Sequence, residues 1–362
     1  MLCVELTCVV FSRVPCYTPQ RVHHIFAVGL RKGPTMLPHI LVSSDQRYVR
    51  FTDHLRQTFG CRVHKVSLDA GFTCPNRDGT VAVGGCIYCN NASFSPGNRR
   101  LSVTTQLEQG KRFLRQRYGA QKFIAYFQAY TNTYSSVQVL RSLYDEALAC
   151  EDIVGLAIGT RPDCVPEAVL DLLADYATRT YLWLELGLES GYDQTLTWLN
   201  RGHTVAAFDD AVRRAQQRHL RLCTHVILGL PGESPVDMLA TMRYLAAQRL
   251  DAIKLHHLHV VRHTVLERLY HQGQVPLFSL EDYATLVVDC LEVLPPEMIV
   301  MRLMGDAPRA MLVAPTWSLD KRAALQRIEQ ELERRDTYQG RLYNATASYA
   351  LPSAGYQLPP LN

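Results

Sequence analysis

Three cysteines in one short segment carry the clearest chemical signal in this sequence. Eleven residues separate Cys74 from Cys86, and two residues separate Cys86 from Cys89. Thiolates are the soft ligands that iron-sulfur clusters require, and a C-x-x-C turn allows two sulfurs to reach neighbouring metals of one cluster. Three glycines between the first two cysteines allow the backbone to wrap around such a group. The segment therefore indicates an iron-sulfur cluster.

The number of cysteines indicates what kind of cluster this is. A cubane that only transfers electrons normally takes four cysteines, so a set of three leaves one iron without a protein ligand. S-adenosylmethionine fits such an iron, because its amino and carboxylate groups can chelate the metal and bring its sulfonium close enough to receive an electron. Breakage of a carbon–sulfur bond then yields a 5′-deoxyadenosyl radical. We thus expect a [4Fe-4S] cluster on Cys74, Cys86 and Cys89, with S-adenosylmethionine as the second cofactor.

A structural zinc site is the main alternative for the same cysteines, since the C-x-x-C spacing is also common in zinc sites. Cys61 or His64 would then be the fourth ligand. Zinc sites usually pair two such turns, whereas this sequence contains a single C-x-x-C. Two other functions stay open at this point: a zinc-stabilised nucleic-acid-binding module and a non-catalytic iron-sulfur sensor.

Composition and charge narrow the class of protein. The chain has 362 residues, of which 47% are hydrophobic and 20% charged, as in an ordinary globular protein. Its net charge of +4 is too small for this length to favour a nucleic-acid partner. Eleven cysteines, an odd number, favour reduced thiols and metal ligation, and hence a cytoplasmic location. The early apolar run Val4 to Phe11 is too short to cross a bilayer, so we expect neither a membrane span nor a secretory signal.

The elements that must position the cysteines alternate along the chain. After a helix expected around Arg47 to Phe59, six short β-branched or aromatic runs alternate with longer amphipathic runs, which is typical of βα units in a parallel sheet. The expected strands are Val63–Leu68, Phe123–Gln128, Ile153–Ile158, Tyr181–Leu186, Leu222–Leu228 and Ala252–Leu258. The expected helices lie near 104–118, 135–149, 165–177, 204–218 and 234–248. Six units are too few for the closed eight-strand barrel, so we predict an α/β fold, a partial (βα)6 barrel whose site lies at the C-terminal ends of the strands.

Four regions are expected along the chain. Residues 1–47 form an N-terminal extension, poorly ordered at least to residue 35, and residues 48–260 form the barrel core. Residues 261–340 form a C-terminal helical appendage and residues 341–362 a tail, extended or poorly ordered. In the appendage we expect helices near 264–272 and 279–292, a short apolar run Met298 to Met301, and a charged helix from about Leu319 to Arg335. That last helix carries both charge signs, which favours a solvated face over an RNA-binding one.

Several segments resemble one known family. Leu68-Asp-Ala-Gly-Phe-Thr-Cys-Pro-Asn-Arg-Asp-Gly-Thr closely resembles the YhcC-type radical S-adenosylmethionine proteins, relatives of the Elongator catalytic subunit and of oxygen-independent coproporphyrinogen oxidase. The further segments that agree, in the same order, are Ala125-Tyr-Phe-Gln-Ala-Tyr-Thr, Gly159-Thr-Arg-Pro-Asp-Cys-Val-Pro, Leu184-Glu-Leu-Gly-Leu-Glu-Ser, Asn200-Arg-Gly-His, Gly229-Leu-Pro-Gly-Glu, Ile253-Lys-Leu-His and Ala314-Pro-Thr-Trp. The resemblance covers roughly residues 48 to 340 and implies a radical enzyme of unknown substrate. No second cysteine trio exists, which puts a second cluster in doubt.

The resemblance also implies roles for single residues. Tyr88, inside the C-x-x-C turn, should lie against the adenine of S-adenosylmethionine, and Gln128 to Thr131, after the second strand, should receive its amino group. Gln128 and Thr131 are therefore expected as binding residues. Glu189 should lie near the same molecule, with Arg201 paired to its carboxylate through a planar guanidinium contact. Loop packing for Tyr88 and residues 128–131, and a surface position for Arg201, are the alternatives.

Position on the strands suggests further residues of the site. Thr160 and Arg161 end the third strand and are expected to line it, although Arg161 could instead pair with Asp163. His225 on the fifth strand and the Gly229-Leu-Pro-Gly turn are expected to complete the pocket floor.

Other residues at these strand ends are ambiguous. Cys164 is a candidate for hydrogen-atom donation or a covalent substrate link, with buried packing as the alternative. Lys65 is either an anionic-substrate contact or a solvated edge residue. The histidines His256, His257 and His259 are expected to be structural rather than metal ligands.

The expected chemistry needs an electron from outside the chain. A small flavin or iron-sulfur protein such as flavodoxin or ferredoxin is the expected donor. RNA and a small metabolite are both candidate substrates, and no membrane partner is expected.

Overall fold

The structure is a computed structural model that describes residues 46–361, except positions 94, 96, 348, 350 and 352–354. All described residues belong to the compact unit Ile40–Asn362. Residues 1–45 of the expected N-terminal extension lie outside the described residues. The prediction that the extension is poorly ordered therefore stays a prediction. Within the described part, no helix is both long and apolar enough to cross a membrane.

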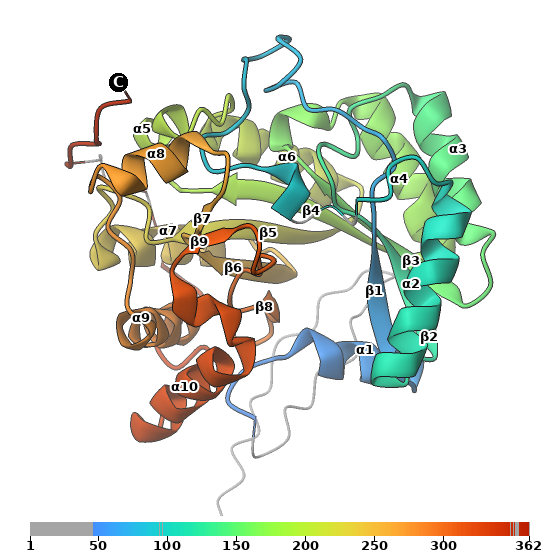
Figure 1. Ribbon diagram of the computed structural model, residues 1–362. Helices are drawn as coiled ribbons and strands as arrows, with labels where there is room; N and C mark the ends of the chain where they lie inside the picture. The colour runs from blue at the N-terminus through green and yellow to red at the C-terminus, as the bar shows by residue number, and fades with distance from the viewer. Residues whose placement is uncertain are drawn as a thin grey trace, which may run out of the picture. The chain divides into compact units, whose positions relative to one another are not determined.

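A curled parallel sheet forms the centre of the described unit (Figure 1). Its seven strands lie in the order β1-β2-β3-β4-β5-β6-β8. Their bounds are β1 Val63–Leu68, β2 Lys122–Phe127, β3 Ile153–Thr160, β4 Tyr181–Glu189, β5 Arg221–Leu228, β6 Ala252–His257 and β8 Ile299–Arg302. The α/β partial barrel is thus confirmed, with one strand more than the six expected. The short run Met298 to Met301 supplies it, because pairing with β6 satisfies the backbone of four residues too few to show a pattern of their own.

Helices follow the strands much as their patterns predict. Their bounds are α1 Phe51–Phe59, α2 Val103–Tyr118, α3 Val137–Leu148, α4 Glu167–Arg179, α5 Asp193–Trp198, α6 Val205–Gln217, α7 Pro235–Ala247, α8 Val265–His271, α9 Leu280–Val293 and α10 Lys321–Arg334. Serine or threonine begins many of them: Ser102 caps α2 and Thr204 caps α6 by accepting a backbone N–H with the side chain. Only α5, of six residues, was not expected, since it is too short for a helical pattern.

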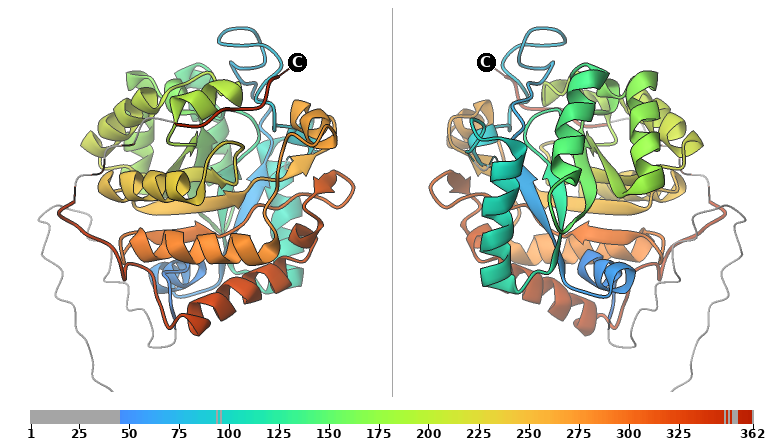
Figure 2. Two further views of the ribbon diagram at one scale, coloured as in Figure 1. Left: turned by 90° about the vertical axis from the view of Figure 1, so that its left-hand side faces the viewer. Right: turned by 90° about the vertical axis from the view of Figure 1, so that its right-hand side faces the viewer.

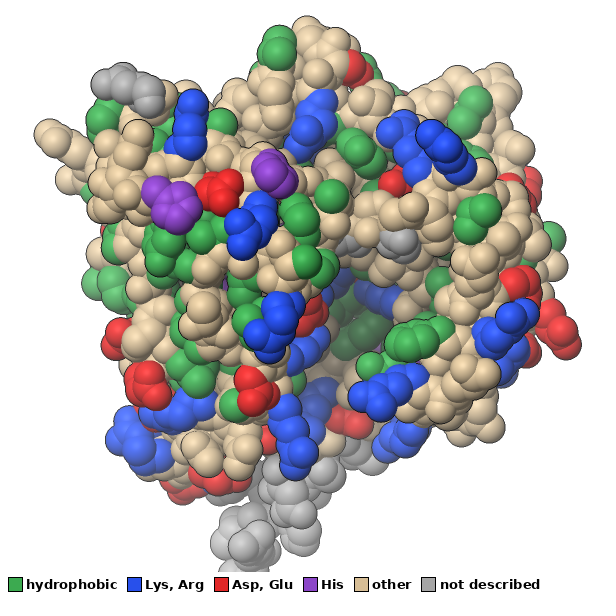
Figure 3. All heavy atoms as spheres, viewed as in Figure 1, with side chains coloured by type: hydrophobic (Ala, Val, Ile, Leu, Met, Phe, Trp, Pro, Cys, Tyr) green, Lys and Arg blue, Asp and Glu red, His purple; other side chains and the backbone are tan. Residues whose placement is uncertain are grey.

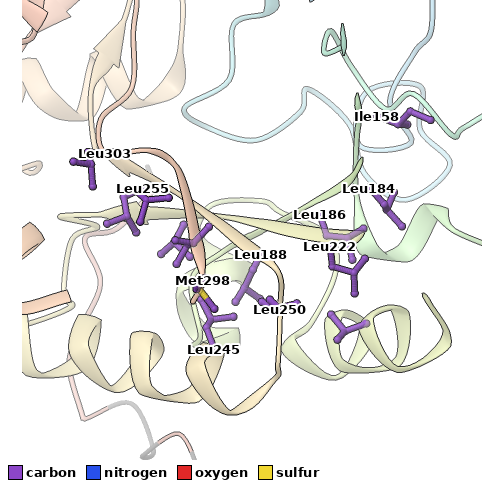
Figure 4. Close-up of a cluster of buried hydrophobic side chains, with 14 of the residues drawn as sticks. Ile158, Leu184, Leu186, Leu188, Leu222, Leu245, Leu250, Leu255, Met298 and Leu303 are labelled. Atoms are coloured by element: carbon purple, nitrogen blue, oxygen red, sulfur yellow. The ribbon is translucent and has the colours of Figure 1, made fainter. Parts of the chain in front are cut away.

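The outer face of the sheet packs against these helices. Leucine and isoleucine side chains of neighbouring strands and of the covering helices form one buried cluster, which includes Leu222, Leu255 and Leu245 (Figure 4). Each of these three side chains is at most 1% exposed. Burial of a leucine contributes about 1.5–3 kcal/mol, so this layer holds the strands in position.

The inner face of the sheet carries a ring of buried apolar side chains near the N-terminal ends of the strands. Each of the seven strands of this sheet contributes to it, with Val63, Ile124, Ala157, Trp183, Cys223, Ala252 and Ile299. Helix α1 closes this end of the curl, with Phe51 and Leu55 packed against the ring. Since side chains alternate along a strand, the next inward positions lie one layer closer to the C-terminal ends.

The appendage lies after β6 along the chain (Figure 2). Strand β7, Val260–Val261, pairs antiparallel with β9, Leu312–Ala314, and the charged helix is α10, packed against α9. Lys321, Arg322, Glu333 and Arg334 of this helix are exposed, as expected of a solvated face, whereas the Glu331 carboxylate is buried and pairs with Arg327, Arg334 and Arg335.

The close approach of α2 to β1 provides a test of this packing. Gly110 of α2 leaves no room for a Cβ, because such an atom would overlap the Val66 side chain. We expect Gly110→Ala to lower the free energy of unfolding by about 1–3 kcal/mol, although alanine favours a helix. Urea denaturation measures it, with the exposed neighbour Gln109→Ala as the control. Equal stability of the two variants would contradict this packing.

Candidate functional site

A cavity of about 550 Å³ opens at the C-terminal ends of the strands. The three cysteines of the loop after β1 line it, and so do residues at the ends of β6 and β8 and just after them. Figure 3 shows that this face of the molecule is hollowed between the segments that carry β8 and β1, with Lys and Arg side chains in and around the hollow. Such a position is where parallel α/β sheets hold their ligands.

The cysteine loop folds through its own backbone hydrogen bonds. Cys89 N–H donates to Cys86 O at 2.9 Å, which closes the C-x-x-C turn, and Gly85 N–H donates to Asn76 O at 2.7 Å. Gly84 and Gly85 both have a φ of 83°, a conformation that favours glycine. The thiol of Cys86 is buried and those of Cys74 and Cys89 are half-buried. The structure thus brings all three predicted cysteines to one cavity wall.

Amide and guanidinium groups surround these sulfurs. Asn76 Nδ2 lies 3.6 Å and Arg201 Nη1 lies 3.7 Å from Cys86 Sγ, and Asn91 Nδ2 lies 3.9 Å from Cys89 Sγ. Nitrogen donors that point at cysteine sulfur stabilise the thiolate form and tune the potential of a cluster. Arg201 Nε, a further donor, is buried and has no hydrogen-bond partner among the described residues. This donor set fits an iron-sulfur cluster. Sequence reasoning missed Asn76 and Asn91, although both lie within two residues of a cysteine.

The two residues proposed as a fourth zinc ligand lie elsewhere. Cys61 packs against the apolar ring at the other end of the strands, and His64 stacks on Tyr118 with 5.1 Å between ring centroids. In the described part of the chain, no group of three or more His, Cys, Asp or Glu side chains is arranged to hold a single metal ion. The geometry therefore offers nothing in favour of the zinc alternative.

Glu189 and Arg201 form an ion pair beside the cysteines. Glu189 Oε1 lies 3.2 Å from Arg201 Nη2, which also donates to Gly187 O at 2.9 Å. Burial raises the pKa of Glu189 although the charge of Arg201 opposes that shift. Strand β4 is irregular here: Glu189 has a φ of 73°, and the register with β5 shifts between Gly187 and Glu189. Tyr88 lines the same part of the cavity.

The predicted residues on β2 and β3 reach the cavity as well. Gln128, Thr131 and Thr160 all line it. Thr131 N–H donates to Thr73 O at 3.2 Å, which fixes the loop after β2 against the cysteine segment. The hydroxyls of Thr160 and Thr133 lie 2.6 Å apart.

Cys164 is the predicted site residue that does not line this cavity. Its thiol is buried beside Asp163, and burial raises its pKa to about 12. Arg161 does line the cavity and also forms the alternative contact, since its Nη2 lies 2.7 Å from Asp163 Oδ2. Its Nη1 donates to Arg201 O at 2.6 Å, which connects β3 to the segment that carries Arg201.

A charged layer lies between the apolar ring and the cavity. Glu185 is completely buried and accepts hydrogen bonds from Lys65 at 2.5 Å, from Lys254 and from His225 at 3.1 Å. Lys254 also donates to the hydroxyl of Tyr126 at 3.0 Å. Glu185, His225 and Tyr126 line the cavity. Lys65 was expected to be either an anionic-substrate contact or a solvated edge residue. Its ammonium group instead forms an ion pair with the buried Glu185 carboxylate. Alternation along the strands was the signal for Tyr126 and Lys254, which sequence reasoning missed.

The Gly229-Leu-Pro-Gly turn does not form the cavity floor, contrary to expectation. The residue after it, Glu233, instead accepts a hydrogen bond from the Ser190 hydroxyl, next to Glu189. Burial raises the pKa of Glu233 from 4.5 to about 7. The residue that follows the turn is thus hydrogen-bonded to Ser190, directly after the end of β4.

The raised pKa of Glu233 predicts a pH-dependent stability. The folded protein keeps this proton between about pH 4.5 and pH 7, where the unfolded chain has lost it, so the free energy of unfolding falls as pH rises through that window. Glu233→Gln cannot lose a proton, so its stability relative to the native protein should increase by about 2–3 kcal/mol from pH 4 to pH 8. Urea denaturation at both pH values measures it, and the exposed Glu281→Gln serves as the control. A constant difference across this range would contradict the prediction.

Comparisons with known proteins agree with this geometry. A family model of the radical SAM superfamily matches residues 74–245, and one of the Radical_SAM C-terminal domain matches residues 250–334. The uncharacterized protein YtqA of Bacillus subtilis is 42% identical over 303 residues, which cover 83% of this chain and 94% of that protein. Protein YhcC of Escherichia coli is 41% identical over 284 residues, covering 78% of this chain and 91% of that protein.

A solved structure shares the fold. The archaeal Elp3 of Methanocaldococcus infernus superposes with a TM-score of 0.59 at 16% sequence identity. The match covers 76% of this chain and 64% of that chain, so the chain spans less than two thirds of that protein. At this identity the likeness shows the fold alone.

Proposed function

This chain belongs to the radical SAM superfamily, and from that premise we propose that Cys74, Cys86 and Cys89 hold its [4Fe-4S] cluster. Enzymes of this superfamily bind such a cluster together with S-adenosylmethionine. When bound, the cluster supplies one electron that splits S-adenosylmethionine into methionine and a 5′-deoxyadenosyl radical. The observation that carries the assignment is the cavity wall lined by three thiols, of which Cys86 and Cys89 lie within 3.9 Å of nitrogen donors from Asn76, Asn91 and Arg201.

The residues around the thiols are proposed to bind S-adenosylmethionine. Glu189 and Arg201 are adjacent to Tyr88, and the pair offers one carboxylate and one guanidinium to a ligand that carries both charge signs. Gln128, Thr131, Thr160 and His225 add polar groups along the same cavity. Arg161 supports them by holding the backbone at Arg201. We assign these groups to binding and orientation, and to exclusion of water from the reacting carbon.

The electron is proposed to come from a small flavodoxin or ferredoxin, since enzymes of this superfamily generally need a donor. The free thiols of the described residues fit a reducing cytoplasm. A role for Cys164 in hydrogen-atom donation stays a prediction, and it would require a movement that exposes this buried thiol.

The similarity to the Elongator relatives covers too little of either chain to imply a shared substrate. Elongator complex protein 3 of mouse is 32% identical over 163 residues, which cover only 44% of this chain. We therefore propose an oxidoreductase or transferase of this superfamily that acts on a substrate of its own.

Reductive cleavage of S-adenosylmethionine tests the proposed function. Anaerobically reconstituted protein should release 5′-deoxyadenosine and methionine when dithionite is added, as measured by chromatography and mass spectrometry. Cys74→Ser, Cys86→Ser and Cys89→Ser should each lose iron and cleavage, because serine oxygen is a harder and poorer iron-sulfur ligand than thiolate.

The matched control is Cys61→Ser, which should keep both iron and cleavage. Loss of metal from this variant would instead support the zinc alternative. Absence of 5′-deoxyadenosine from native protein with a full complement of iron and sulfide would refute the proposed function.

A further inference from the structure

One part of the cavity lining comes from a later part of the chain than the cysteines. His256 is the penultimate residue of β6, His259 follows that strand, and Arg302 ends β8. None of these residues is among those assigned to S-adenosylmethionine. The His256 ring stacks on His225 with 5.7 Å between centroids, which makes the two regions continuous. We define this part as the Arg302 subsite: Arg302, His256 and His259.

Gly305 lies against the two imidazoles of the subsite. A Cβ at Gly305 would stand 3.2 Å from His256 Nδ1 and 3.1 Å from His259 Nδ1. A side chain at this position would therefore crowd both ring nitrogens. His259 Nδ1 is buried and lacks a hydrogen-bond partner within the described chain. A buried polar atom of this kind normally has a partner, so His259 Nδ1 is available to a polar group of a ligand.

Positive charge exceeds negative charge in and beneath this part of the cavity. The cations are Lys65, Lys254 and Arg302, and the carboxylates with which they pair are Glu185 and Asp306. Three cations against two carboxylates leave one positive charge over. Burial, and then the charge of Arg302, lower the pKa of His256 and that of His259, the latter to about 4. The imidazoles are thus neutral at pH 7, and the local field attracts an anion.

The guanidinium of Arg302 keeps binding capacity toward the cavity. Its Nη2 lies 2.6 Å from Asp306 Oδ2, while its Nη1 lies 3.5 Å from His256 Nε2, a long and weak contact. A guanidinium has five N–H donors in a planar fork, which suits carboxylate and phosphate oxygens. Arg302 can therefore bind an anionic oxygen without giving up Asp306.

We propose that the Arg302 subsite binds an anionic group, a carboxylate or a phosphate monoester, of a small-molecule substrate. This inference rests on the proposed function and names the substrate class of the same site. A ligand pocket for small molecules measures roughly 300–1,000 Å³, and this cavity of about 550 Å³ also has to hold S-adenosylmethionine. An anion fixed at Arg302 would hold a substrate inside the same cavity that the three cysteines line.

Equilibrium dialysis of labelled inorganic phosphate and labelled acetate tests the subsite. The sample is full-length protein, reconstituted anaerobically and loaded with S-adenosylmethionine. We expect at least one of the two probes to bind, and the stronger of them identifies the phosphate or the carboxylate. Arg302→Gln should weaken this binding about tenfold or more, because it removes a charge-assisted hydrogen bond.

Two further variants make the test specific. Lys321 also pairs with Asp306, so Lys321→Gln removes one cation from this carboxylate, as Arg302→Gln does. Lys321 does not line the cavity, however, and anion binding should therefore change less than about twofold. Gly305→Ala places a methyl group against both imidazole nitrogens without any change of charge and should weaken binding as Arg302→Gln does. It also tests the subsite if the Arg302 variant fails to fold.

Three results would overturn the inference: no binding of either probe, equal weakening by Arg302→Gln and Lys321→Gln, or full binding by Gly305→Ala. Cleavage of S-adenosylmethionine is measured in parallel on the native protein and on Lys321→Gln. Cleavage without anion binding refutes the subsite alone. Absence of cleavage refutes the proposed function, whatever the dialysis shows.

Discussion

The buried carboxylate of Glu185 is the interaction on which the interior of this sheet depends. A carboxylate without exposure to solvent is costly unless cations and hydrogen bonds compensate it. Burial raises its pKa, but Lys254 and Lys65 outweigh this effect and hold the pKa of Glu185 well below its usual range. The two lysines come from β6 and β1, on opposite sides of β4 in the strand order. The pairs therefore join distant strands across the inside of the curl.

This arrangement places the cavity at a defined depth. Along the strands the inward side chains form first an apolar ring, then the charged layer around Glu185, and then the cavity wall. Helix α1 and the apolar ring close the inside of the curl to water at the N-terminal ends of the strands. The charged layer gives the base of the cavity a fixed pattern of hydrogen bonds. A reactive carbon radical needs such a surrounding, since mobile water and mobile side chains would offer it the wrong reactions.

Local sequence signals were sufficient for much of the fold and for the cysteine wall. Strands with clear patterns and helices with serine or threonine caps were found within a few residues, and the three cysteines lie in one loop. What could not be predicted depends on contacts between distant segments. β8 has four residues and exists through its pairing with β6, and the partners of Glu185 come from strands 120 and 69 residues away. The irregular end of β4 at Glu189 likewise depends on Arg201, which a strand pattern does not contain.

The two ends of the strand order have a consequence for how such a protein can evolve. Among the described strands, β1 and β8 are the edges of the sheet and share no ladder of hydrogen bonds with each other. Helix α1 packs against both edges near the N-terminal ends of the strands. At the other end, side chains rather than paired backbone form the boundary between the edges. Substitutions there can widen or narrow the entrance without breaking a strand pair, so new substrates can be admitted while the radical-forming half of the molecule stays unchanged.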